Sequence, residues 1–230
     1  MYIYKIISII KSCDEISIYR LEPVENEKIR YKPGQFIMLH LLNEKKQTID
    51  KRPYSIASDP SEPYIELAIK NINGRFTSKL KNVKVGDLVG VEGPFGSFYF
   101  NKENKAVFIA GGVGITPLMS MLRHIIKNNI KGEYKLFYSC KTQNSILYCE
   151  EFEEMKKKGI EVIIFLTREE TVPAGYERGR IDEERIKKYV KDPSEWIYFM
   201  CGPFDLVSSL KKLLIKMNVP ETSIKFESWG

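Results

Sequence analysis

Hydrophobic and polar residues alternate along much of the first hundred residues, which is the pattern of half-buried β-strands. Within Tyr64–Lys70, an Ile or Leu stands at every second position, separated by Glu, Ala and Lys. Another strand is predicted for Gln35–Leu42 after a Pro-Gly turn, and the block closes with Val89–Glu92 and a Gly-Pro-Phe-Gly turn at 93–96. Short strands separated by turn residues predict a closed antiparallel β-barrel.

The hydrophobic period changes at Lys105. Ala106–Ala110 has the continuous apolar character of a buried strand, and a glycine-rich segment at 111–117 leads into apolar residues at helical spacing. Strand and helix pairs are then predicted at 135–138 and 149–158, at 161–166 and 182–189, and at 196–200 and 204–217, before a last strand at 223–226. This alternation predicts a five-stranded parallel sheet. We therefore predict two domains, a β-barrel over 1–101 and an α/β domain over 105–230.

Composition narrows the class of protein. A length of 230 residues suits two domains, and the net charge of +6 is spread along the chain, so we expect no nucleic-acid partner. No apolar run has the length of a membrane helix and the N-terminus does not resemble a signal peptide, which predicts a cytoplasmic location. The four cysteines lack metal-site spacing, so no metal is expected. The oligomeric state is left open.

The segment KRPYSIAS at 51–58 holds the first candidate binding residues. The guanidinium of Arg52 suits a pyrophosphate, the ring of Tyr54 suits a planar ring system, and the hydroxyl of Ser55 suits a ring nitrogen. Strand alternation places Arg52 and Tyr54 on one face and Pro53 and Ser55 on the other, so their convergence requires a local twist. The alternative is an exposed strand with an incidental Arg and Tyr.

A second candidate segment breaks the β pattern at 73–78. Gly74 permits close backbone approach, and Thr77 together with free amides at a helix start suits a phosphate. Residues 78–81 are predicted to form a single helical turn. A hairpin loop with an incidental helix cap is an equal alternative.

The glycine-rich segment at 111–117, GGVGITP, predicts a phosphate loop between a strand and a helix. It differs from the dinucleotide motif G-x-G-x-x-G because Pro117 stands where the third glycine belongs. It also lacks the Gly-Lys-Ser/Thr ending of a P-loop. A related nucleotide-binding loop is therefore expected.

Six short motifs resemble those of the ferredoxin-NADP reductase family in order and spacing: R-P-Y-S at 52–55, N-G-R-F-T at 73–77, G-P-F-G at 93–96, G-G-V-G-I-T-P at 111–117, C-G-P at 201–203 and E-S-W at 227–229. The resemblance covers nearly the whole chain. It implies an N-terminal antiparallel β-barrel that binds FAD and a C-terminal nucleotide-binding domain, with hydride passing between nicotinamide and flavin. Iron-sulfur modules of some members are not matched, so any such centre is expected in a partner.

The resemblance also implies a role for each motif. Arg52 would bind the FAD pyrophosphate, Tyr54 would lie against the isoalloxazine, and Ser55 would bond its N5 edge. Further FAD contacts would come from Pro53, Asn73, Gly74, Arg75, Phe76 and Thr77. The nicotinamide nucleotide's pyrophosphate would lie at Gly112, Gly114, Thr116 and Pro117. Cys201 would lie beside the nicotinamide, followed by Gly202 and Pro203, although a small buried structural cysteine is the alternative there.

The function implied by the resemblance is that of an NADPH-linked flavoenzyme. It would exchange hydride with the nucleotide and single electrons with a small acidic carrier such as ferredoxin or flavodoxin. Two alternatives remain: the reductase component of an oxygenase, and a flavin-binding electron-transfer subunit that is not an enzyme by itself.

The choice of nucleotide depends on a few side chains. An NAD site usually offers an acid after its second strand, yet the strand at 135–138 is followed by Ser139, Cys140 and Lys141. Arg168 and Arg180 resemble the cations with which NADPH-using relatives bind the 2'-phosphate. NADP is therefore expected over NAD, and incidental surface charges are the alternative.

The last residues are expected at the ligand edge of the parallel sheet, because the final predicted strand ends there. The resemblance implies that Trp229 covers the isoalloxazine face and that Glu227 helps to couple proton and hydride movement. Stacking of Trp229 on the FAD adenine is one alternative, and a merely anchoring role is another.

Overall fold

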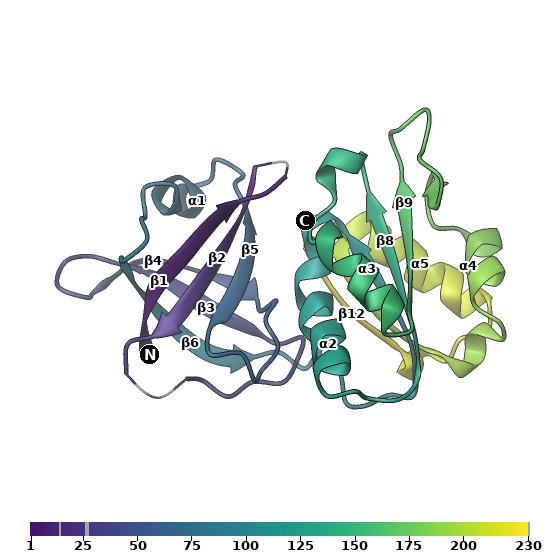
Figure 1. Ribbon diagram of the computed structural model, residues 1–230, viewed down its shortest axis with the longest axis horizontal. Coiled ribbons are helices and arrows are strands. Elements are labelled where there is room, and N and C mark those ends of the chain that lie inside the picture. The colour runs from purple at the N-terminus through teal and green to yellow at the C-terminus, as the bar shows by residue number, and fades with distance from the viewer. Residues whose placement is uncertain (14, 26–27, 230) are drawn as a thin grey trace. The chain divides into compact units, whose positions relative to one another are not determined.

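The computed structural model describes residues 1–13, 15–25 and 28–229, with Trp229 described for its backbone alone. The chain forms two compact units (Figure 1). The first comprises Met1–Phe100 with Met119–His124, and the second comprises Asn101–Leu118 with Ile125–Gly230. Each unit is built on one sheet of six strands.

The first unit is an antiparallel β-barrel, which confirms the predicted fold class. Its strands are hydrogen-bonded in the order β4-β3-β6-β1-β2-β5, and the two edge strands β4 and β5 also contact each other. Its elements are β1 (Tyr2–Lys11), β2 (Ile16–Pro23), β3 (Phe36–Leu42), β4 (Thr48–Ser55), β5 (Ile65–Lys70), α1 (Arg75–Leu80) and β6 (Leu88–Phe95).

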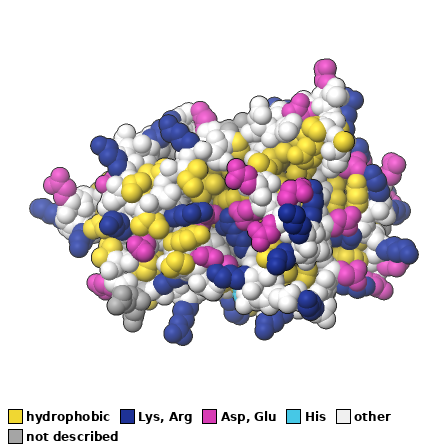
Figure 2. Space-filling view, viewed as in Figure 1, with side chains coloured by type: hydrophobic (Ala, Val, Ile, Leu, Met, Phe, Trp, Pro, Cys, Tyr) yellow, Lys and Arg dark blue, Asp and Glu magenta, His cyan; other side chains and the backbone are white. Residues whose placement is uncertain are grey.

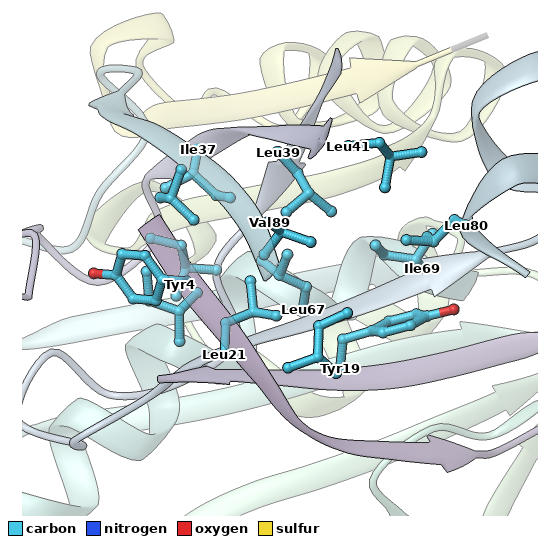
Figure 3. Packing of buried hydrophobic residues seen from close by; sticks show 14 of the residues in the cluster. Tyr4, Tyr19, Leu21, Ile37, Leu39, Leu41, Leu67, Ile69, Leu80 and Val89 are labelled. Atoms are coloured by element: carbon cyan, nitrogen blue, oxygen red, sulfur yellow. The ribbon is translucent and has the colours of Figure 1, made fainter. Parts of the chain in front are cut away.

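Alternate side chains of these strands fill the barrel (Figure 3). Leu39 and Leu41 of β3 and Leu67 and Ile69 of β5 are buried and point into one cluster. Burial of each such side chain stabilises the fold by about 1.5–3 kcal/mol. The buried hydroxyl of Tyr4 accepts a hydrogen bond from a backbone amide. The period-two pattern of the sequence is therefore the inward face of the barrel.

Strand β6 extends to Phe95, into the turn that the sequence predicts at 93–96. Phe95 pairs with Phe36 of β3, and the register of this ladder shifts between Phe36 and Met38. The shift accommodates Pro94, which has no N–H to donate to a regular ladder. The Gly-Pro sequence therefore lies within an irregular last part of the strand and does not terminate it.

Six residues of helix α2 (Ile115–Lys127) complete the first unit through two buried carboxylates. Nη1 of Arg123 donates to Oε1 of Glu66 at 2.8 Å, and Nδ1 of His124 lies 2.7 Å from Oδ2 of Asp59. Burial acts to raise the pKa of Asp59, but hydrogen bonds, chiefly that with His124, lower it to about 2. Both carboxylates are 1% exposed, so they depend on these partners.

The second unit is a parallel α/β sheet in the order β10-β9-β8-β7-β11-β12. Helices α4 and α5 share one buried cluster with it, whereas α3 lies on the opposite face (Figure 1). Besides α2, its elements are β7 (Lys105–Gly111), β8 (Glu133–Cys140), α3 (Cys149–Lys157), β9 (Ile160–Leu166), β10 (Tyr176–Arg178), α4 (Glu183–Tyr189), β11 (Ile197–Pro203), α5 (Phe204–Lys216) and β12 (Ile224–Trp229).

The predicted count of five parallel strands is one too low. The additional strand, β10, is three residues long and pairs with the end of β9, with Arg178 opposite Leu166. Its sequence, Tyr-Glu-Arg, contains no apolar run, so hydrophobic periodicity does not detect it. Pairing with a buried neighbour, and not its own composition, makes it a strand.

Charge is dispersed over the surface. On the face shown in Figure 2, Lys and Arg side chains are interspersed with Asp and Glu. Within the described residues, no helix has the length and apolarity needed to cross a membrane. The same part of the chain contains no group of three or more His, Cys, Asp or Glu side chains arranged to hold a metal ion.

Candidate functional site

Strand β4 positions the first group of predicted site residues. Arg52 has a side chain that is 53% exposed, and Tyr54 is half-buried with its ring 5.7 Å from that of Phe76 on α1. Burial raises the pKa of Tyr54 to about 12, so its hydroxyl stays neutral. Pro53 and Ser55 alternate with them along the strand, and Ser55 is its half-buried last residue. This places a cation and an aromatic ring on one face.

The turn at 73–77 is stabilised by hydrogen bonds of the Thr77 side chain. The amide of Gly74 donates to Oγ1 of Thr77 at 3.1 Å, and the same hydroxyl lies 3.2 Å from the carbonyl of Gly74. Asn73 has φ +53°, and Thr77 is buried. The helix predicted over 78–81 in fact begins at Arg75, three residues earlier, where the Thr77 hydroxyl satisfies the amide of Gly74 before the first turn. Thr77 therefore shapes the turn through its hydroxyl.

A buried carboxylate that none of the sequence motifs contains lies beside these residues. Asp50 lies on β4, and its oxygens contact Arg52, Arg75 and Lys79. The two guanidinium groups retain exposed donors, which is the chemistry that suits the diphosphate of a dinucleotide. Asp50 precedes Arg52 by two residues and so shares its strand face, but this spacing alone does not reveal a carboxylate that contacts three cations.

In the second unit, two glycines bring the central strands into close approach. A β-carbon on Gly202 of β11 would lie 3.2 Å from the Cα of Gly111 on β7. Chain order reverses between these strands, since β8 follows β7 on one side and β11 lies on the other. A ligand crevice in such sheets lies outside the carboxyl ends of the strands at this reversal. Gly111 is the last residue of β7, and Gly202 is the last but one of β11.

In the glycine-rich loop, most of the residues predicted to contact the nucleotide are buried. Gly112 is exposed with φ +53° and open space where a side chain would point. Gly114, Thr116 and Pro117 are buried, and the hydroxyl of Thr116 donates to the carbonyl of Val113 at 2.7 Å. Pro117 lies in the first turn of α2, where no amide donor is required. The accessible part of the loop is the backbone at Gly112.

Tyr138 of β8 forms hydrogen bonds that fix the position of this loop. No sequence motif contains Tyr138. Its hydroxyl donates to the carbonyl of Gly112 at 3.1 Å and lies 3.3 Å from the amide of Leu147. The side chain is fully buried. The buried Tyr138 side chain therefore fixes the position of the exposed backbone at Gly112.

We expect Tyr138→Phe to lower the stability by about 1–3 kcal/mol, because the buried amide of Leu147 and the carbonyl of Gly112 lose their partner. Nucleotide affinity should fall about threefold as the loop loosens, measured by calorimetry with NADP. Tyr134→Phe is the matched control, since its hydroxyl bonds Glu103 and Lys131 at the opposite end of β8. Equal nucleotide affinity in both variants would show that Tyr138 does not position the loop.

Cys201 and Glu227 lie side by side at the ligand edge of the sheet. Their Cα atoms are register partners on β11 and β12. Burial, reinforced by the nearby Glu227 carboxyl, raises the pKa of the Cys201 thiol well above its ordinary range, so the thiol stays protonated. Burial also raises the pKa of Glu227 to about 7. The pair thus combines a neutral thiol with a carboxyl that exchanges a proton near neutral pH.

The backbone of the final residues continues this edge. Ser228 pairs with Gly202, and Trp229 pairs with Pro203. The side chain of Trp229 lies outside the described part of the structure, so its predicted stacking on a flavin or adenine ring stays a prediction.

The cations predicted to select the nucleotide lie at neighbouring strand ends. The amide of Arg168, just past β9, donates to the carbonyl of Lys141, just past β8, at 2.9 Å. Arg180 follows β10, whose last residue pairs with the end of β9. All three side chains are exposed. Their backbones therefore bring three cations to one edge of the second unit.

Comparison with known proteins agrees with this arrangement. Residues 4–100 match the oxidoreductase FAD-binding domain, and residues 108–212 match the oxidoreductase NAD-binding domain. The chain belongs to the ferredoxin-NADP reductase-like family. It accordingly combines an oxidoreductase FAD-binding domain with an oxidoreductase NAD-binding domain.

Individual relatives belong to several electron-transfer systems. Flavohemoprotein A of Dictyostelium discoideum is 29% identical over 96% of this chain and 58% of its own length. The propane 2-monooxygenase reductase component of Mycolicibacterium goodii is 29% identical over 95% of this chain and 64% of its own. The chain thus spans about three fifths of these relatives. The FAD/NAD-binding domain of a Vibrio cholerae nitric oxide dioxygenase shares the fold, with a TM-score of 0.89, 21% identity and coverage of 100% and 98%.

Proposed function

We propose that this reductase oxidises NADPH and passes the electrons singly to a separate, small acidic carrier protein such as ferredoxin or flavodoxin. Each NADPH supplies two electrons as hydride, so two carrier molecules are reduced and one proton is released. Bound FAD supplies the chemistry that links hydride transfer to single-electron transfer. The chain's own residues bind and orient the two cofactors and hold the proton.

The observation that carries the choice of NADPH is the cation edge of the second unit. Lys141 and Arg168 are joined through their backbones, and both side chains are exposed. No acid follows β8 directly, where an NAD site would offer one to the ribose hydroxyls. A 2'-phosphate dianion would be met there by charge-assisted hydrogen bonds.

Glu227 and Cys201 have complementary roles in the proposed reaction. The neutral Cys201 thiol offers no thiolate that would react with the nicotinamide, and it lies at the end of a central strand. Glu227 titrates near neutral pH and lies on the next strand, so it holds a proton that the reaction releases or consumes. Ser55, at the end of β4, is proposed to bond the N5 edge of the flavin.

A second candidate is the reductase component of an oxygenase. The similarity to the reductase component of propane 2-monooxygenase favours it, because the same two domains are matched in that protein. The remaining alternative, a flavin-binding subunit without activity of its own, is tested by the protein loaded with FAD. Absence of NADPH-dependent ferricyanide reduction by that protein would contradict an autonomous reductase. Comparing reduction rates for ferredoxin, flavodoxin and an oxygenase component would then identify the carrier class.

We expect Arg168→Ala to lower kcat/KM for NADPH at least tenfold and to leave kcat/KM for NADH nearly unchanged. A lost hydrogen bond to a charged group is worth about 1.5–3 kcal/mol, and about 1.4 kcal/mol corresponds to a factor of ten. Steady-state ferricyanide reduction with both nucleotides measures the effect. Lys157→Ala, on the exposed end of α3, is the charge-matched control. Equal kcat/KM for the two nucleotides in the unmodified protein would contradict the proposed preference.

A further inference from the structure

A buried carboxylate on β4 is surrounded by three cations from two elements. Oδ1 of Asp50 lies 3.3 Å from Nη1 of Arg52, while Oδ2 lies 3.0 Å from Nε of Arg75 and 3.4 Å from Nζ of Lys79. Oδ1 also accepts a hydrogen bond from the amide of Lys51 at 3.0 Å. One carboxyl group thereby joins β4 to α1.

The geometry separates an inner side of this cluster from an outer one. The Asp50 side chain is 6% exposed, whereas those of Arg52, Arg75 and Lys79 are 53%, 73% and 38% exposed. Arg75 approaches Asp50 through Nε, and most of its side chain stays exposed. Arg52 uses Nη1, which also donates to the carbonyl of Lys51 at 2.7 Å. The carboxylate therefore contacts the three cations on their buried side and leaves their exposed side open to solvent.

We propose that Asp50 is a positioning residue that gathers Arg52, Arg75 and Lys79 into a preformed site for the FAD diphosphate, with Lys79 as a third cation of that site. The proposal rests on the proposed function, in which this unit binds FAD. The proposed site includes one carboxylate, Asp50, and one lysine, Lys79. Neither residue belongs to the motifs by which this chain resembles the family.

Charge balance explains why a carboxylate favours an anion site here. Three cations held together without an anion repel one another and spread into solvent, where long side chains are disordered. One carboxylate offsets a single charge and leaves a net of about two positive charges, which matches the two negative charges of a diphosphate. The ordering of the three side chains is then complete before the ligand arrives.

Asp50 is ionised under ordinary conditions. Burial acts to raise its pKa, but Lys79, Arg75 and the Lys51 amide together lower it below its ordinary value. The cluster therefore keeps its charge across the neutral pH range, and its effect on ligand binding should not depend on pH there.

The test compares FAD with riboflavin, which lacks the diphosphate, on protein stripped of flavin. We expect Asp50→Asn to weaken FAD binding about tenfold, equivalent to about 1.4 kcal/mol, and to leave riboflavin binding unchanged. Flavin fluorescence quenching gives both dissociation constants. Glu92→Gln is the charge-matched control, because Glu92 contacts His40 and Lys51 and not the three cations. It should leave both constants unchanged.

A second variant keeps the proposal testable if Asp50→Asn folds poorly. Arg75→Gln changes an exposed side chain and should weaken FAD binding, and not riboflavin binding, by several-fold. Because Asp50 acts through Arg75, the double variant should lose less than the product of the two single losses.

Several outcomes would overturn the proposal. Tighter FAD binding by Asp50→Asn would mean that the carboxylate competes with the diphosphate. Equal losses for FAD and riboflavin would indicate a general structural role, and an unchanged FAD constant would indicate none. If the unmodified protein failed to bind FAD at all, the proposed function would fail with it, which distinguishes that failure from the others.

Discussion

A Gly202→Val variant is expected to lose about 2–3 kcal/mol of stability and nearly all nucleotide binding. The new β-carbon would lie 3.2 Å from the backbone N and Cα of Gly111, and the register pair of Cys201 with Ala110 immediately before the two glycines holds these backbones together. Overpacking against atoms that cannot move costs about 1–3 kcal/mol, and valine adds two more methyl groups. Thermal unfolding should shift down by about 4–12 °C. Calorimetry with NADP measures the lost binding.

The matched control for this substitution is Gly159→Ala, just past α3. A β-carbon there meets nothing within 4 Å, so its cost is limited to the left-handed backbone, about 1–2 kcal/mol. It should leave NADP affinity unchanged. A Gly202→Val protein with unchanged melting temperature would show that β7 and β11 separate more easily than their register indicates.

Glu227→Gln is expected to stabilise the protein by about 2 kcal/mol at pH 8 and to leave it unchanged at pH 4. Burial raises the pKa of Glu227 from 4.5 to about 7. Between these values the folded protein retains a proton that the unfolded chain has released. The contribution of Glu227 is therefore fully present below about pH 4.5 and is lost as the pH rises through 7. A shift of this size is worth about 3 kcal/mol before a reduction for partial exposure.

Melting temperatures of the two proteins across this pH range measure the effect. The difference should grow to about 4–8 °C by pH 8. A control substitution, Glu221→Gln, lies on an exposed residue just before β12 and should show no such pH dependence. Parallel curves for Glu227→Gln and the unmodified protein would show that the carboxyl is ionised like an ordinary glutamate.

The architecture followed from hydrophobic periodicity because burial selects side chains by position. Alternation at Ile65, Leu67 and Ile69 marks the barrel interior, and the change of period at Lys105 marks the start of the parallel sheet. Strand β10 escaped prediction because its pairing depends on β9 and not on its own three residues. Local sequence is insufficient wherever a neighbour supplies the stabilising contacts.

The sequence motifs located the candidate binding residues but not the residues that position them. Arg52, Gly112 and Cys201 stand out by residue type and neighbouring sequence. Asp50 and Tyr138 do not, because a carboxylate behind cations and a phenol beneath a loop act through contacts that only folding creates. The raised pKa of Glu227 likewise depends on burial, which no residue type encodes.

The contribution of Met119–His124 to the first unit bears on how the chain folds during synthesis. A nascent chain of one hundred residues contains every strand of the barrel, yet it lacks Arg123 and His124. Glu66 would keep its ion pair with Arg20 but lack that with Arg123, and Asp59 would lack its contact with His124. Removing one partner from a buried pair costs about 3–5 kcal/mol. The barrel is therefore completed only after the ribosome has passed His124, and a fragment ending at Phe100 is a poor choice for separate expression.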